Sequence, residues 1–194
     1  MSLDFKKLTE NLQTIYQNYE LEAAQFKEEA ICSRGCSFCC TEVGNIDIVT
    51  LEGLILIERL ESMPKSEAKI ISQRLERDRE SRQKGKKSAC PFLDDQEACL
   101  VYDVRFFSCR QLYSLRKCDL NGSLVHKQAV SLAQKAVREI QKLDYTGYSG
   151  HHSFILHLLQ NETFRKTYSS GGFDPGKIQK FGKKHGIIIN RFAK

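Results

Sequence analysis

The sequence contains no apolar run long enough to cross a bilayer. Its longest run, Leu54–Ile57, is far shorter than the about 20 residues that a membrane-spanning helix needs. The first turns of the chain are charged and amphipathic, without the continuous apolar core and small-residue cleavage site of a secretory signal peptide. Internal repeats and low-complexity segments are also absent. We therefore expect a cytoplasmic globular protein that does not bind membranes.

Two other absences narrow the function. The Gly171-Gly172 segment lacks the Lys-Ser/Thr pair and the preceding strand of a phosphate-binding loop. The basic charge also lacks a recognition motif: residues 164–194 carry eight Lys/Arg and one Asp (8 − 1 = +7), so the rest of the chain is close to neutral (6 − 7 = −1). A solvated basic tail is the simpler interpretation, so nucleic acid is not expected as a partner, while a protein partner stays open.

Hydrophobic periodicity predicts a mainly α-helical chain. Thr50, Ser66 and Ser123 are candidate N-caps, and Asp174-Pro175 predicts the start of a short final helix. The stretch 88–118 has the turn residues and short apolar pieces of loops and extended segments. We predict a small helical domain over 1–170, wrapped around a loop-rich cysteine module, and a basic C-terminal appendage over 171–194. Apolar residues three or four apart predict helices over 3–30, 51–61, 66–84, 124–143 and 152–168.

Eight cysteines are the dominant chemical feature. In a reducing compartment, clustered thiols bind metal or do redox chemistry more often than they form disulfides. Thiolates are soft ligands that suit zinc, copper(I) and iron–sulfur clusters. Spacings of two or three residues let successive sulfurs converge on one centre, and Gly35 supplies a flexible backbone between them. We predict one soft-metal site, or two adjacent ones, with the early group Cys32, Cys36, Cys39 and Cys40 completed by Cys90, Cys99 and Cys109.

The spacing leaves the identity of the metal open. A close cysteine triplet followed by Cys90-Pro91 is similar to the binding runs of ferredoxins, but the triplet spacing differs from the bacterial pattern. Paired C-x2-C zinc knuckles are also absent. An iron–sulfur cluster and zinc are therefore both expected cofactors. Arg34, Arg105 and Arg110 flank the thiols, where guanidinium groups would offset the negative charge of a four-thiolate centre.

These segments together resemble a known family. The elements are Cys32-x3-Cys36-x2-Cys39-Cys40, Cys90-Pro91-Phe92-Leu93, Cys99-Leu100-Val101-Tyr102-x2-Arg105 and Cys109-Arg110. Their order resembles the CxxCxxCC, or YkgJ-like, cysteine-cluster family, described as a zinc- or iron-chelating domain. The resemblance covers about residues 30–113 and implies that Cys32, Cys36, Cys39, Cys40, Cys90, Cys99 and Cys109 are metal ligands. Cys118 falls outside the pattern, and Phe106 stands where the family usually has proline.

A larger protein, flagellin lysine-N-methylase, carries a similar cysteine pattern, and the C-x3-C-x2-C spacing is shared with radical S-adenosylmethionine enzymes. The chain lacks their repeated strand–helix units, and its extra cysteines would close the open iron position that such catalysis needs. Three functions stay open. The first is a cysteine-ligated metal protein with a redox or accessory role. The second is an S-adenosylmethionine-dependent iron–sulfur enzyme such as a protein lysine N-methylase, and the third is a structural zinc module that binds a partner or nucleic acid.

Histidines form a weaker candidate site. His151-His152 with His157 is the one histidine cluster of the sequence, but His152 and His157 are five residues apart, which does not place them on one helix face. Capping or packing against the following helix is the simpler role for His152. We name no catalytic residue.

Overall fold

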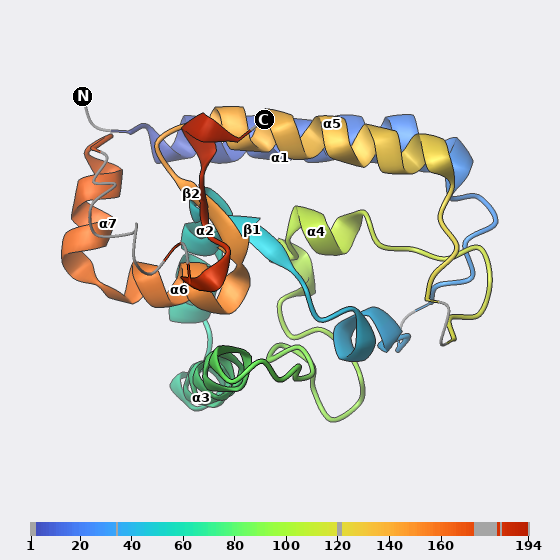
Figure 1. The fold of residues 1–194 in the computed structure, drawn as a ribbon, viewed down its shortest axis with the longest axis horizontal. Helices are drawn as coiled ribbons and strands as arrows, with labels where there is room; N and C mark the ends of the chain where they lie inside the picture. The colour runs from blue at the N-terminus through green and yellow to red at the C-terminus, as the bar shows by residue number, and fades with distance from the viewer. Residues whose placement is uncertain (1–2, 34, 120–121, 173–181, 183, 194) are drawn as a thin grey trace.

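The computed structural model describes residues 3–33, 35–119, 122–172, 182 and 184–193. Over these residues the chain is mainly helical, which confirms the predicted fold class, and it adds a small antiparallel sheet (Figure 1). The strands are β1 (Asp47–Val49), β2 (Tyr148–His151) and β3 (Ile188–Ile189). The α-helices are α1 (Phe5–Ala23), α2 (Thr50–Glu61), α3 (Lys65–Gln83), α4 (Phe107–Arg110), α5 (Lys127–Leu143), α6 (His152–Gln160) and α7 (Glu162–Ser169).

Helices α1 and α5 lie side by side along one edge of the molecule (Figure 1). Asp4 begins α1 by accepting a hydrogen bond from the Lys7 N–H (3.1 Å), as an N-cap does. The small side chains Ala133 and Ala136 of α5 are buried in this contact and let the two helices approach closely. The predicted helix over 3–30 ends early, at Ala23, because its apolar stripe is interrupted there and a 3-10 turn follows.

The sheet places β2 between β1 and β3, with both pairs antiparallel. Gly150 faces Ile48 on β1, and a Cβ at this position would lie 3.0 Å from Ile187 Cγ1, so the close approach of the chain after it favours glycine. Of the two glycines in the turn-like segment 147–150, Gly150 lies within β2, whereas Gly147 immediately precedes the strand. Strand β3 belongs to the predicted appendage, and there Ile187 and Asn190 are buried against the helical body.

Helix boundaries depend on local capping groups. The predicted helix over 152–168 is two helices, because Asn161 takes an extended backbone and its side chain accepts the Phe164 N–H (3.0 Å). Helix α5 begins after His126 rather than after Ser123. Helix α2 includes Thr50, while the Glu52 carboxylate accepts the Val49 N–H (3.0 Å). The predicted helix start at Asp174-Pro175 lies outside the described residues.

The larger core joins the helices to the cysteine-bearing loops. It is formed by α2, α3, α6 and the sheet, together with Phe92, Val101 and Phe106 from the stretch between α3 and α4. Burial of these side chains fixes the loops as firmly as the helices they pack against. Among the helices of the described residues, none is long and apolar enough to cross a membrane.

Candidate metal centre

The first cysteine segment ends in a π-helical turn, Cys39–Val43. A tight turn precedes it, with the Cys36 N–H donating to the Ser33 carbonyl (3.0 Å) and the Cys40 N–H donating to the Ser37 carbonyl (2.8 Å). Gly44 closes the turn in the left-handed region (φ 70°), which glycine adopts without steric cost. The backbone therefore turns sharply on both sides of the adjacent Cys39 and Cys40.

The second cysteine segment is hydrogen-bonded directly to the first. The Cys90 N–H donates to the Cys40 carbonyl at 2.7 Å, across 50 residues of sequence. A small hairpin follows, in which Cys99 pairs with Leu93 and the Leu100 N–H donates to the Phe92 carbonyl (2.9 Å). Cys90 and Cys99 thus lie at the start and end of one hairpin, and this hairpin is hydrogen-bonded to the Cys40 turn.

The third segment is the short helix α4, which carries Cys109. Cys90, Cys99 and Cys109 all pack against the larger core. Burial raises the pKa of the Cys109 thiol, and the nearby Cys99, Cys40 and Cys39 thiols raise it further. At Cys40, the hydrogen bond with Cys39 lowers the pKa, but the hydrogen bond with Cys90 and burial outweigh it and raise the pKa to about 12. Thiols from all three segments are therefore electrostatic neighbours.

A second group of thiols lies closer to solvent. Cys32 and Cys36 are exposed, while Cys118 is half-buried. The Ile31 N–H donates to the Ser114 carbonyl (3.0 Å), and the Ser114 N–H hydrogen-bonds the Cys32 thiol. Burial raises the pKa of Cys32, and its neighbours Cys36, Cys118 and Cys39 add to the rise. Cys118, which the family pattern omits, thus lies beside the first predicted ligand.

The thiols are neighbours, but their sulfur atoms do not converge closely on one position. All eight cysteines are free, and no three of them, all within the described residues, bring their sulfurs within 4.8 Å of one another. Of the flanking arginines, Arg105 partly offsets the pKa increase that burial causes at Cys99. Arg110 instead lies over the Tyr16 ring, 4.8 Å from its centroid. Arg34 lies outside the described residues.

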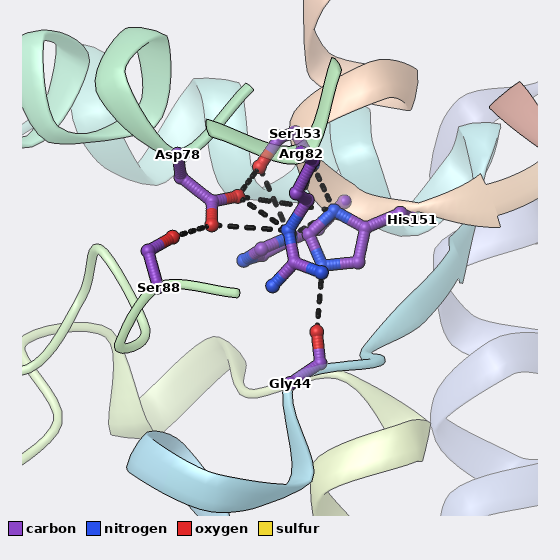
Figure 2. A network of polar contacts seen from close by, with 7 residues as sticks. Gly44, Asp78, Arg82, Ser88, His151 and Ser153 are labelled. Carbon is purple, nitrogen blue, oxygen red and sulfur yellow. Dashed lines mark hydrogen bonds and ion pairs between the residues drawn. The ribbon is translucent and has the colours of Figure 1, made fainter. Parts of the chain in front are cut away.

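A buried polar network joins the ends of two cysteine segments (Figure 2). Asp78 of α3 accepts hydrogen bonds from Arg82 (3.0 Å to each oxygen) and from the hydroxyls of Ser88 and Ser153. The His151 Nε2–H donates to the Gly44 carbonyl (3.2 Å). Ser88 lies two residues before Cys90, and Gly44 follows the Cys39–Val43 turn. The network therefore holds both segments to α3 and to the start of α6.

Asp78, His151 and His152 also bring ligand atoms within 4.8 Å of one another, which is a spacing that a metal ion can use. Their hydrogen bonds argue against a metal there. The Ser153 N–H donates to both Nδ1 atoms, at 3.3 Å for His151 and 2.9 Å for His152, and so fills the space between the rings. Arg82 already neutralises the Asp78 carboxylate. We assign this cluster to holding the fold together.

Burial sets the charge of the two rings. It lowers the pKa of His151 to about 4, with Arg82 adding to the decrease, and it lowers the pKa of His152 well below its ordinary value. Both imidazoles are therefore neutral at pH 7. The buried His152 Nε2 has no hydrogen-bond partner among the described residues, and the ring stands edge-on to Phe92 and Phe106. The sequence indicated packing for His152, but it gave no sign of Asp78, which lies 73 residues before His151 and in no recognisable motif.

A cavity of about 420 Å³ opens beside the third segment. Val43 and Ser108, which lie near thiol-bearing residues in the sequence, are among its lining residues, together with residues of the sheet, α2, α4 and α5. The charged side chains among its described lining residues are Asp47 and Glu52, and none of these residues is basic. Burial raises the pKa of Glu52, whose carboxylate accepts three hydrogen bonds. The lining therefore suits a neutral or cationic molecule rather than an anion.

Comparison of the chain with protein-family models finds no match, and neither does comparison with curated proteins or with solved structures. The functional assignment consequently rests on the residues and their geometry alone.

Proposed function

We propose that this protein holds an iron–sulfur centre through its clustered cysteines and uses it in electron transfer or in support of a partner enzyme. It would then be a member of the CxxCxxCC family that its sequence resembles. One observation carries the proposal: three segments remote in sequence meet through the Cys90 N–H to Cys40 carbonyl bond and through the mutual neighbours Cys40, Cys99 and Cys109. Free thiols gathered from distant segments are the donor set that a soft metal centre requires.

The spacing of the thiols favours a cluster over a single zinc ion. A zinc–sulfur bond is about 2.3 Å, so four thiolates around one tetrahedral zinc lie about 3.8 Å apart. No three cysteines of the chain, all eight of which are described, reach even 4.8 Å. The thiolates of a four-iron cluster each bind a different iron and are therefore farther apart. Zinc stays the second choice for the same ligands.

Anaerobic purification followed by assays of iron, acid-labile sulfide and zinc, with visible and EPR spectra, tests the proposal. We expect brown protein that contains iron and sulfide. Cys90→Ser is expected to lose a large part of the colour, whereas Ala89→Ser, which adds a serine at the exposed preceding position, keeps it. Colourless protein with stoichiometric zinc would show that the cysteines bind zinc instead of an iron–sulfur cluster. Protein that is folded but holds neither metal would refute the proposal.

The cavity supports a second function, an S-adenosylmethionine-dependent iron–sulfur enzyme. Its volume is in the range of small-molecule sites, and it reaches Ser108, next to Cys109. The sulfonium of S-adenosylmethionine is a cation, which suits a lining whose described charged groups are carboxyls. A change in the EPR spectrum of the reduced protein on addition of S-adenosylmethionine, lost in Asp47→Asn, would support this function. An unchanged spectrum would exclude it.

A further inference from the structure

Cys39 and Cys40 are adjacent on the π-helical turn, and their thiols are hydrogen-bonded to each other. Consecutive residues of a helix point about 100° apart, so neighbours do not share one face. The Cys40 carbonyl accepts a hydrogen bond from the Cys90 N–H, and the Cys40 thiol interacts with the Cys90 and Cys99 thiols. Cys39 is a neighbour of Cys99 and Cys109 as well, but it is also a neighbour of the solvent-facing Cys32. Cys90, Cys99 and Cys109 already complete one four-coordinate centre together with Cys40, so that centre does not need Cys39.

The segment that carries Cys118 is fixed against the start of the cysteine loop. Besides the Ile31–Ser114 bond, the Ser114 hydroxyl donates to the Arg116 carbonyl (2.7 Å) and accepts the Leu124 N–H (3.0 Å). The Leu115 N–H donates to the Leu124 carbonyl (3.0 Å). These bonds tie Leu124 to the segment 114–116, whose backbone is held beside Cys32. Cys118 closely follows that segment, so its proximity to Cys32 follows from main-chain geometry.

We infer that the eight thiols form two separate four-thiolate sites, and that Cys118 is a ligand of the second. The inner site is made of Cys40, Cys90, Cys99 and Cys109, and the outer site of Cys32, Cys36, Cys39 and Cys118. This inference rests on the proposed function and deepens it. Each site takes a soft centre, either an iron–sulfur cluster or a zinc ion, because four thiolates complete the coordination of either one.

The two sites differ in how open they are to solvent. Three ligands of the inner site pack against the larger core. Cys32 and Cys36 of the outer site are exposed. A centre with exposed ligands loses metal to a chelator more readily than one enclosed by the core. We therefore expect metal to leave the protein in two phases, with the outer site emptying first.

Metal content of single serine variants tests this division. After anaerobic reconstitution with iron and sulfide, or in a parallel arm with zinc alone, Cys118→Ser and Cys99→Ser are each expected to hold about half of the wild-type metal, since each removes one of two four-thiolate sites. In Cys118→Ser the fast phase of metal release to a chelator is the one lost, and in Cys99→Ser the slow phase. Lys117→Ser, a change at the exposed position beside Cys118, keeps both phases.

Cys36→Ser is the control for misfolding, because Cys36 is exposed in the structure. As a ligand of the outer site, it should lose the same half of the metal content as Cys118→Ser. If Cys118→Ser retains the wild-type metal content, Cys118 is not a ligand and the inference is wrong. If Cys118→Ser and Cys99→Ser each lose all metal, there is one centre rather than two. If the wild-type chain binds no metal in either arm, the proposed function itself fails, and the inference with it.

Discussion

Replacement of Asp78 by alanine is the strongest test of the network that holds the two cysteine segments. Asp78 is 2% exposed, and it accepts hydrogen bonds from Arg82 and from two serine hydroxyls. Its removal leaves the buried Arg82 guanidinium unpaired. Removal of one partner of a buried ion pair costs about 3–5 kcal/mol, so we expect the free energy of unfolding of Asp78→Ala to fall by that amount.

The chain offers a matched control. Asp103 also pairs with an arginine, Arg59 at 2.7 Å, but its side chain is 57% exposed. Asp103→Ala is expected to cost about 0–1 kcal/mol, as for other surface ion pairs. Both variants are measured by urea unfolding at pH 7, followed by far-UV circular dichroism. If Asp78→Ala is no less stable than Asp103→Ala, the network does not hold the fold.

A second substitution separates the two sources of the loss. Arg82→Leu in the Asp78→Ala background removes the unpaired cation but leaves the serines without their acceptor. We expect it to restore part of the lost stability, because an apolar side chain tolerates the buried site better than an uncompensated charge does. A further loss of stability in the double variant would show that Arg82 stabilises the fold by other contacts.

Three further predictions concern stability. The unfolded state binds a proton at His151 below about pH 6.5, whereas the folded state binds it only near pH 4, so the stability that this group contributes is present above pH 6.5 and falls by up to about 3 kcal/mol toward pH 4. The difference in unfolding free energy between wild type and His151→Gln should therefore shrink over this pH range, and a constant difference would contradict the prediction. Glu52→Gln places an amide against backbone donors and should cost about 1–3 kcal/mol, whereas the exposed Glu58→Gln should be neutral in the same denaturation assay. Gly53→Ala sets a Cβ 2.7 Å from Leu159 Cδ1 and should lower stability by about 1–3 kcal/mol in thermal unfolding; an unchanged midpoint would mean that the core adjusts.

The sequence predicts the helices well, because their apolar stripes are local. The helix over 51–61 corresponds to α2 (Thr50–Glu61), and the one over 66–84 corresponds to α3 (Lys65–Gln83). Strand β2 escapes prediction because Gly150 has low strand propensity and because the strand depends on partners from distant segments. The division of the last long helix at Asn161 follows from one capping side chain within an otherwise helical pattern.

The candidate site is predicted in part. The early thiol group and its companions at Cys90, Cys99 and Cys109 follow from motif order, and whether they bind metal stays a prediction. Motif order gives no information on Cys118, whose place beside Cys32 depends on the hydrogen bonds that tie Leu124 to the segment 114–116. The Asp78–His151 network likewise depends on the packing of α3 against α6, which no local pattern encodes.

X-ray absorption of the anaerobically isolated protein, at the iron and zinc edges, tests the central claim most directly, because it reports the atoms bound to the metal. We predict a first shell made of sulfur alone at about 2.3 Å, with an iron–iron shell if the centre is a cluster. Cys90→Ser should hold less metal than the wild type, about half if there are two separate four-thiolate sites. A first shell of nitrogen and oxygen, or a metal content unchanged in that variant, would contradict the account.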